Sequence, residues 1–196
     1  LGAKLPKVDN ARDRYLSIED INLLRDTVKQ TNDKSLHIFL ELLLQTGARR
    51  FSILTLKKKD INLASKEVSI KNHKTNTTYK GFLQDDLIEP LNEYLKDFKI
   101  NDDIFSYNEN MDYSQTGHKL LTILDKLFNV GLASNDRKNR VVIHTLRHTM
   151  ASHLAINGTP IFTIQKLLNH SDITQTMRYA KLSPESGKNA IQGLYK

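Results

Sequence analysis

The sequence contains no cysteine among its 196 residues, and this absence excludes several classes of protein at once. Without thiols there can be no disulfide scaffold, cysteine-ligated zinc, iron–sulfur cluster or cysteine nucleophile. No run of about eighteen apolar residues occurs, so a membrane-spanning helix is not expected. The chain begins at Leu1 without an initiator Met, a basic n-region or an apolar h-region. We therefore expect no signal peptide, and we expect the sequence to be a fragment of a longer protein.

The composition that remains is that of a folded, basic protein. Hydrophobic residues make up 39% of the chain and charged residues 26%, which is enough apolar material for one domain or at most two small ones. Lys and Arg exceed Asp and Glu, and the formal net charge is +7. An excess of positive charge favours polyanionic partners such as nucleic acid or an anionic membrane face. Charge alone is weak evidence, so the function must be argued from motifs.

Local patterns predict a mainly α-helical chain with one small antiparallel sheet, an α+β fold. A capping box at Ser17–Asp20 predicts a helix to about residue 30, and a largely apolar segment predicts a buried helix that ends before Gly47. Alternating residues predict two strands around a polar turn at 72–78. Further helices are expected over 87–95, 120–128, 145–157 and 160–168, followed by one capped by Ser171 and Asp172 and one opened by Ser183 and Pro184.

The segment His144-Thr145-Leu146-Arg147 is the most informative part of the sequence. Its imidazole and guanidinium stand three positions apart and so share one face at a helix N-terminus, where backbone N–H groups attract anions. Arg147 offers a planar fork for two phosphate oxygens, and His144 can exchange a proton near neutral pH. A helix cap with a surface ion pair would give the same pattern, so this pair alone does not identify an anion-binding site.

Four other motifs accompany this pair in a fixed order. Thr46-Gly47-Ala48-Arg49 and Lys74 precede it, and Leu168-Asn169-His170 and Arg178-Tyr179 follow it. Together the five elements resemble the catalytic domain of the tyrosine recombinase family, which contains phage integrase-like and Xer-type enzymes. The resemblance spans about residues 17–188, nearly the whole chain. It implies the catalytic-domain fold of DNA breaking-rejoining enzymes.

The resemblance also implies a role for each of six residues. Tyr179 would attack the scissile phosphate, which gives a 3′-phosphotyrosyl link and a free 5′-hydroxyl. Arg49 and Arg147 would clamp the non-bridging oxygens as charge builds on them. The other three would handle protons or hydrogen bonds: Lys74 as the general acid for the leaving 5′ oxygen, His144 in proton removal from Tyr179, and His170 as a hydrogen-bond donor to the phosphate.

The implied activity is site-specific recombination of double-stranded DNA, in integration, excision, transposition or dimer resolution. No cofactor and no metal are implied, and the sequence has neither a P-loop nor a paired-carboxylate metal site. The resemblance further implies a homotetramer on paired DNA sites, with no membrane partner, in the bacterial cytoplasm and associated with the nucleoid. A type IB topoisomerase-like enzyme and a non-catalytic DNA-binding module are the alternatives.

The expected domain organisation has three parts. Residues 1–14 form a linker or entry segment, residues 15–182 form the catalytic domain, and residues 183–196 form a C-terminal segment. By resemblance this last segment docks on a neighbouring subunit, although a short self-packed tail fits its few apolar residues equally well. An N-terminal DNA-binding domain, typical of the family, is expected to be missing from this chain.

Several positions leave a choice open or depart from the family pattern. Arg50 could take the place of Arg49, and Lys71 or Lys80 could take the place of Lys74 or contact backbone phosphates. Ser52 stands where the family usually has an acidic residue, and Asn169 where Gly commonly precedes the second histidine. His148 is expected to pack or to support the site from behind, and not to bind zinc. His37 and His153 lie in apolar helical surroundings and are expected to be interior histidines.

Overall fold

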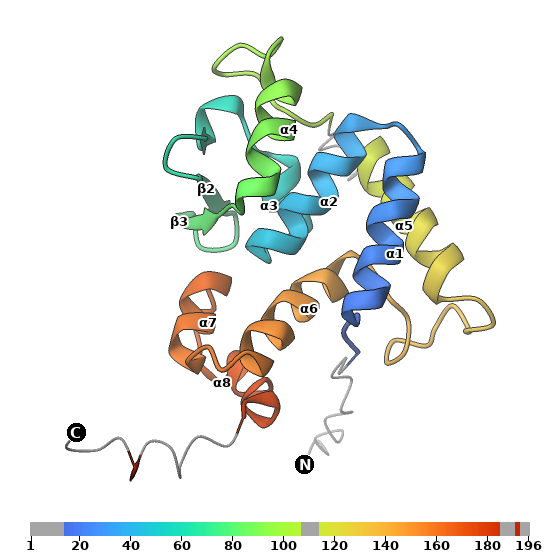
Figure 1. Ribbon diagram of the computed structural model, residues 1–196, viewed down its shortest axis with the longest axis vertical. Helices are drawn as coiled ribbons and strands as arrows, with labels where there is room; N and C mark the ends of the chain where they lie inside the picture. The colour runs from blue at the N-terminus through green and yellow to red at the C-terminus, as the bar shows by residue number, and fades with distance from the viewer. Residues whose placement is uncertain (1–13, 107–113, 185–190, 193–196) are drawn as a thin grey trace, which may run out of the picture.

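The computed structural model describes residues 14–106, 114–184 and 191–192 of the chain (Figure 1). It contains α-helices packed around a shared core and one three-stranded antiparallel sheet, which confirms the predicted fold class. Within the described ranges, no helix is long and apolar enough to cross a membrane. The expected entry segment and most of the expected C-terminal segment lie outside the described residues.

The first two helices form the centre of the core. Helix α1 (Ile18–Gln30) begins at the predicted capping box, where Asp20 N donates to Ser17 Oγ at 3.1 Å and Ser17 N donates to Asp20 Oδ2 at 3.2 Å. Helix α2 (Lys34–Thr46) is buried on nearly every face, as its apolar composition predicted. A short helix, α3 (Arg50–Leu54), follows at once and was not predicted.

The sheet has the strand order β1 (Ile61–Asn62), β2 (Glu67–Asn72) and β3 (Thr77–Phe82), and a short 3₁₀ turn, η1 (Lys58–Asp60), leads into it. Val68 pairs with Gly81, and Ile70 pairs with Tyr79, on the face that packs against the helices. A Cβ atom on Gly81 would lie 2.8 Å from Thr46 Cγ2 at the end of α2. The missing side chain therefore lets β3 lie directly against the end of α2.

The remaining helices are α4 (Asp85–Leu95), α5 (Gln115–Phe128), α6 (Ile143–Ile156), α7 (Ile161–Leu168) and α8 (Thr174–Met177), with a 3₁₀ turn η3 (Ala180–Leu182). Helix α6 packs on α2, α5 and α7. Figure 1 shows the β2–β3 hairpin and α7–α8 on one side of the molecule and α1 and α5 on the other. The chain thus brings the hairpin, the end of α2 and the helices α6–α8 to one side.

Two predicted helix starts differ in detail. Pro160 was expected at the first helical position, but it lies one residue earlier, as the N-cap of α7. Ser171 and Asp172 were expected to cap α8, but Ile173 is the N-cap residue. Asp172 Oδ1 still accepts a hydrogen bond from Thr174 N at 2.9 Å. Asp172 therefore still caps the start of α8, from one position before the N-cap residue.

Candidate active site

The turn between α2 and α3 positions the first arginine. Gly47 ends α2 with φ of 59°, a left-handed conformation that favours glycine. A Cβ atom on it would lie 2.6 Å from Met150 Sδ and 2.9 Å from Leu168 Cδ2, so glycine is also needed for the close approach of α6 and α7. Two residues later, Arg49 is the N-cap of α3. The Thr-Gly-x-Arg spacing thus reflects a turn packed against the other site helices.

Arg147 is the buried centre of the site, with only 3% of its surface exposed. Its guanidinium donates from Nη1 to Gly47 O at 2.7 Å and from Nη2 to Leu168 O at 2.5 Å. Burial, and after it the charge of Arg49, lowers the pKa of Arg147 to about 10. The group is still a cation at neutral pH, and two carbonyl oxygens fix the plane of its fork.

Tyr179 lies against α6 and is 4% exposed. Its hydroxyl shares a hydrogen bond of 2.6 Å with His148 Nδ1, and the His144 ring packs edge-on against His148 with centroids 4.8 Å apart. Burial raises the pKa of Tyr179, whereas the charges of Arg178 and Arg147 oppose that rise. The residue that touches the phenol is therefore His148, which lies outside the six site residues predicted from the sequence. The sequence feature that could have pointed to His148 is its position one turn after His144 on the same helix face.

His170 follows α7, whose C-cap residue Asn169 is left-handed with φ of 49°. This conformation is common for Gly and tolerated by Asn, which explains why Asn can stand at the position before the second histidine. His170 Nδ1 shares a hydrogen bond of 2.8 Å with Thr176 Oγ1. Burial, together with the charges of Arg147 and Arg49, lowers the pKa of His170 to about 4. The imidazole is thus neutral at pH 7 in the absence of an anion.

Lys74 lies on the exposed β2–β3 turn. Its backbone N–H donates to Asn72 Oδ1 at 3.1 Å, and the neighbouring His73 holds the turn against α3. The His73 ring packs on Phe51 with centroids 4.3 Å apart, and His73 Nε2 shares a hydrogen bond of 2.9 Å with Thr55 Oγ1. The turn is therefore tied to the same short helix that follows Arg49.

Lys71 and Lys80, the two alternatives to Lys74, lie within the strands and not at the turn. Lys71 and Lys80 alternate with the buried residues of their strands, so both are exposed on the face away from the helices. Lys80 Nζ also pairs with Glu67 Oε2 at 2.8 Å. Of these three lysines, only Lys74 lies at the tip of the hairpin.

The charge of Arg49 reaches the site. Arg49 acts on the pKa values of Arg147, His170 and Tyr79. Its side chain makes no hydrogen bond or ion pair with the part of the chain that the structure describes. Ser52, at the position usually acidic in the family, is buried in α3. Arg49 therefore stands without an acidic partner in the described ranges.

These side chains surround a hollow of about 330 Å³. Four of the six predicted residues line it, namely His144, Arg147, His170 and Tyr179, together with His148, Thr174, Gln175 and Arg178. Arg49 and Lys74 are not among its lining residues. The lining carries guanidinium and imidazole groups and no carboxylate, an arrangement suited to an anion. Although three histidines line the hollow, no three His, Asp or Glu side chains of the described residues are grouped to hold a metal ion.

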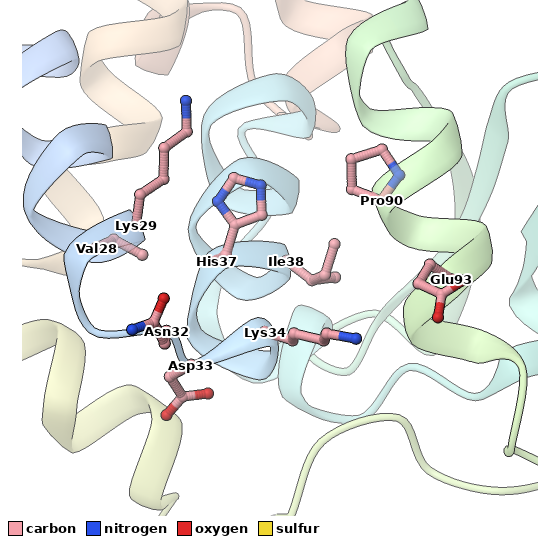
Figure 2. A pocket seen from close by; sticks show the side chains of 9 residues that line it. All are labelled: Val28, Lys29, Asn32, Asp33, Lys34, His37, Ile38, Pro90 and Glu93. Atoms are coloured by element: carbon pink, nitrogen blue, oxygen red, sulfur yellow. The ribbon is translucent and has the colours of Figure 1, made fainter.

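A larger hollow of about 440 Å³ lies between the α1–α2 turn and α4 (Figure 2). Lys29 and Lys34 stand there with Asp33 and Glu93, so its lining mixes charges of both signs. His37, at its centre in Figure 2, is half-buried, and its Nδ1 atom has no hydrogen-bond partner among the described residues. This hollow lacks the converging cations of the smaller one, so its volume does not make it the better candidate.

Comparison with known proteins agrees with this geometry. The model of the phage integrase family matches residues 14–186. Over 185 residues the chain is 30% identical to the tyrosine recombinase XerA of Saccharolobus solfataricus, a match that covers 94% of this chain and 58% of XerA. The catalytic domain of bacteriophage HP1 integrase superposes with a TM-score of 0.70 at 22% identity, covering 92% of this chain and 94% of that domain.

The Tn1549 transposon integrase in complex with circular intermediate DNA superposes with a TM-score of 0.67 at 17% identity, covering 94% of this chain and 67% of that one. The fold is thus that of the integrase catalytic domains. The chain belongs to the phage integrase family. It spans 58% to 64% of the length of the curated tyrosine recombinases that it matches, among them XerA and XerD proteins.

Proposed function

We propose that this chain is the catalytic domain of a tyrosine recombinase, which cleaves and rejoins double-stranded DNA through a 3′-phosphotyrosyl link to Tyr179. The observation that carries the proposal is the placement of Tyr179 on the wall of a hollow that also holds Arg147 and His170. A phenol is a poor nucleophile at neutral pH unless a proton acceptor and positive charge lie beside it. Both are present, since His148 shares a hydrogen bond with the phenol and Arg178 lies 5.9 Å from the ring centroid.

The cations account for the stabilisation of the transition state. The Arg147 fork, held by two carbonyl oxygens, meets two non-bridging oxygens, and Arg49 adds a second guanidinium. His170, neutral before DNA binds, gains affinity for a proton when the phosphate arrives and donates to it. Lys74 closes over the leaving 5′ oxygen from the hairpin tip. His144 supports proton transfer through the His148 ring on which it packs.

The same proposal extends to the whole protein. Residues 15–182 form the catalytic domain, a DNA-binding domain precedes it, and four copies act on paired DNA sites with residues 183–196 docked on a neighbour. Sequence-specific strand exchange is favoured over topoisomerase-like relaxation because the relatives are named recombinases. The complex of the Tn1549 integrase with DNA supports DNA as the partner. The proposed compartment is the bacterial cytoplasm, at the nucleoid, where such a substrate is found.

A trapping experiment on nicked duplexes of randomised sequence tests the chemistry and selects the DNA site at the same time. The chain is incubated with these duplexes in EDTA, and covalent adducts are separated on a denaturing gel. A nick beside the cleavage position releases a short 5′-hydroxyl strand, so the phosphotyrosyl link cannot be reversed. We expect wild-type adducts whose recovered DNA shares a sequence, and no adduct with Tyr179→Phe because the nucleophilic oxygen is lost.

Tyr15→Phe is the matched control, because Tyr15 packs edge-on against His153 with centroids 5.8 Å apart and lies outside the hollow. This variant should form adducts at the wild-type level. An adduct that survives Tyr179→Phe, or that requires a divalent metal, contradicts the mechanism. Relaxation of supercoiled plasmid without sequence preference in the recovered DNA would favour the topoisomerase alternative.

A further inference from the structure

Tyr79 is a half-buried residue of β3 to which none of the roles above is assigned. Because side chains alternate along a strand, Tyr79 points to the same face as Gly81, which packs against the end of α2. The Tyr79 hydroxyl is buried and has no formed hydrogen bond with any described residue. Buried hydroxyl groups nearly always have a partner, so this one needs an explanation.

Tyr79 and Arg147 both meet the end of α2, because the β3 face that carries Tyr79 packs against Thr46 and Arg147 donates to Gly47 O. Burial raises the pKa of the Tyr79 phenol, and the nearby charges of Arg147 and Arg49 oppose that rise. A side-chain hydrogen bond with Arg147 also lowers the pKa of the phenol, so the guanidinium and the hydroxyl lie within reach of each other, although they do not meet the geometry of a formed hydrogen bond. Arg147 lines the hollow, whereas Tyr79 is not among its lining residues. Tyr79 is thus placed to contact Arg147 without entering the hollow.

The other neighbours of the Arg147 fork suggest what Tyr79 does. Two of its N–H groups donate to Gly47 O and Leu168 O, and the guanidinium has five N–H groups in all. We infer that Tyr79 is a positioning residue for Arg147, whose hydroxyl oxygen accepts a third N–H group of the fork when an anion occupies the hollow. The inference relies on the proposed function only for its effect on DNA cleavage.

A neutral acceptor suits this position better than an acidic one. A carboxylate beside Arg147 would orient the guanidinium but would also offset the positive charge that the phosphate needs. A phenol that stays protonated, like the two carbonyl oxygens, orients the fork and leaves its charge available. Hydrogen bonds of a catalytic site are often unformed without substrate and tighten when it binds, which accounts for the unpartnered hydroxyl.

The test compares the wild-type chain with Tyr79→Phe, which keeps the ring and removes only the hydroxyl. Inorganic phosphate is the probe for the hollow. Rotation of the Arg147 guanidinium about its Cζ–Nη bonds is measured by ¹⁵N NMR in the presence of phosphate, and the signals are assigned by their loss in Arg147→Lys. We expect rotation about tenfold faster in Tyr79→Phe, the effect of losing one hydrogen bond to a charged group.

Two further measurements separate positioning from a packing role. The thermal unfolding midpoint of Tyr79→Phe should equal or exceed that of the wild type, because an unpartnered hydroxyl is removed. Trapping of DNA by Tyr179 should be about tenfold slower, with DNA affinity unchanged. Tyr94→Phe is the control: the Tyr94 hydroxyl donates to Ile104 O at 2.5 Å, so its loss should lower the midpoint and leave Arg147 rotation unchanged.

Each outcome decides the inference. Unchanged Arg147 rotation in Tyr79→Phe overturns it, whatever happens to cleavage, because Tyr79 would then not act through Arg147. Faster rotation with wild-type cleavage overturns its functional part. If the wild-type chain forms no adduct on any DNA, the proposed function fails, and the NMR comparison with phosphate still decides whether Tyr79 holds the fork.

Discussion

Arg147 is a buried cation whose hydrogen-bond acceptors are carbonyl oxygens instead of carboxylates. A buried charge without a counter-charge is costly, and a pKa lowered to about 10 reflects that cost. The cost has a purpose in a site for phosphate, because an internal carboxylate would compete with the substrate for the same fork. The same reasoning applies to Arg49, which has no acidic partner among the described residues.

His170 allows a prediction about pH. Its pKa is about 4 in the folded chain and 6.5 in the unfolded chain, so between these values the unfolded state binds more protons. Stability is therefore complete above pH 6.5 and falls as the pH is lowered toward 4. We expect a loss of roughly 1 to 2 kcal/mol in the free energy of unfolding, after solvent screening of a half-buried ring. Urea unfolding at a series of pH values measures it.

The contribution of His170 is the difference between the pH curves of the wild type and His170→Gln. That variant should lose part of the slope between pH 6.5 and 4, because Gln does not titrate. His118→Gln, a change on the exposed face of α5, should keep the wild-type slope. A curve for His170→Gln that is parallel to the wild type over this range would contradict the lowered pKa.

At the scale of elements, the turn from α2 to α3 requires glycine at position 47, both for its backbone conformation and for its close contacts. A Cβ atom on Gly47 would clash with α6 and α7, and the left-handed backbone disfavours any side chain. We expect Gly47→Ala to lower the free energy of unfolding by roughly 2 to 4 kcal/mol and to abolish adduct formation. Urea unfolding and the trapping assay measure the two effects.

Gly158 is the matched control for this change. It has φ of 78°, but a Cβ atom there would meet nothing within 4 Å. Gly158→Ala should cost only the backbone strain, about 1 kcal/mol, and leave adduct formation intact. If the two variants lost equal amounts of the free energy of unfolding, the close contacts at Gly47 would not contribute to the effect of Gly47→Ala.

The elements that the sequence predicted well are those whose signals are local. The capping box of α1, the apolar run of α2 and the alternation of β2 and β3 are each readable within a dozen residues. Helix α3 and strand β1 are too short for a periodic signal and depend on tertiary contacts. Helix starts shifted by a residue or two, as at α8, where Ile173 is the N-cap residue and Asp172 stands one position before it.

The site, like the fold, could be predicted from the sequence only where its signals are local. Six residues stand in motifs that can be recognised along the chain, but the contacts between them join segments about 20 to 100 positions apart, such as Arg147 to Leu168 and to Gly47. The position of His148 one turn after His144 can be noticed along the chain, but its contact with Tyr179 and the interaction of Tyr79 with Arg147 cannot be predicted from it. Those relationships depend on how α6 packs against α2 and α7, which no single-sequence pattern specifies.

At the scale of the whole molecule, the excess of seven positive charges predicts salt-dependent DNA binding. Each phosphate contact contributes a slope of about −0.9 in a plot of log affinity against log salt concentration. We expect Lys74→Gln to reduce the magnitude of the slope by about one contact, because Lys74 lies at the exposed hairpin tip. Fluorescence anisotropy with a labelled duplex over a salt series measures it.

Lys96→Gln removes an equal charge elsewhere and controls for net charge. Lys96 pairs with Glu93 at the end of α4, so its loss should leave the slope unchanged. Equal changes in slope for both variants would assign the effect to net charge. A wild-type affinity that does not vary with salt would contradict a phosphate-facing surface altogether.

The contact of His73 with α3 links the β2–β3 hairpin to that helix. Phe51 and Thr55 hold the hairpin tip through His73, and Arg49 is the residue from which α3 begins. Helix α3 thus lies between two cations, Arg49 at its N-cap and Lys74 beside His73. In the proposed mechanism these are part of the clamp and the general acid, so one short helix would set the distance between them before DNA binds.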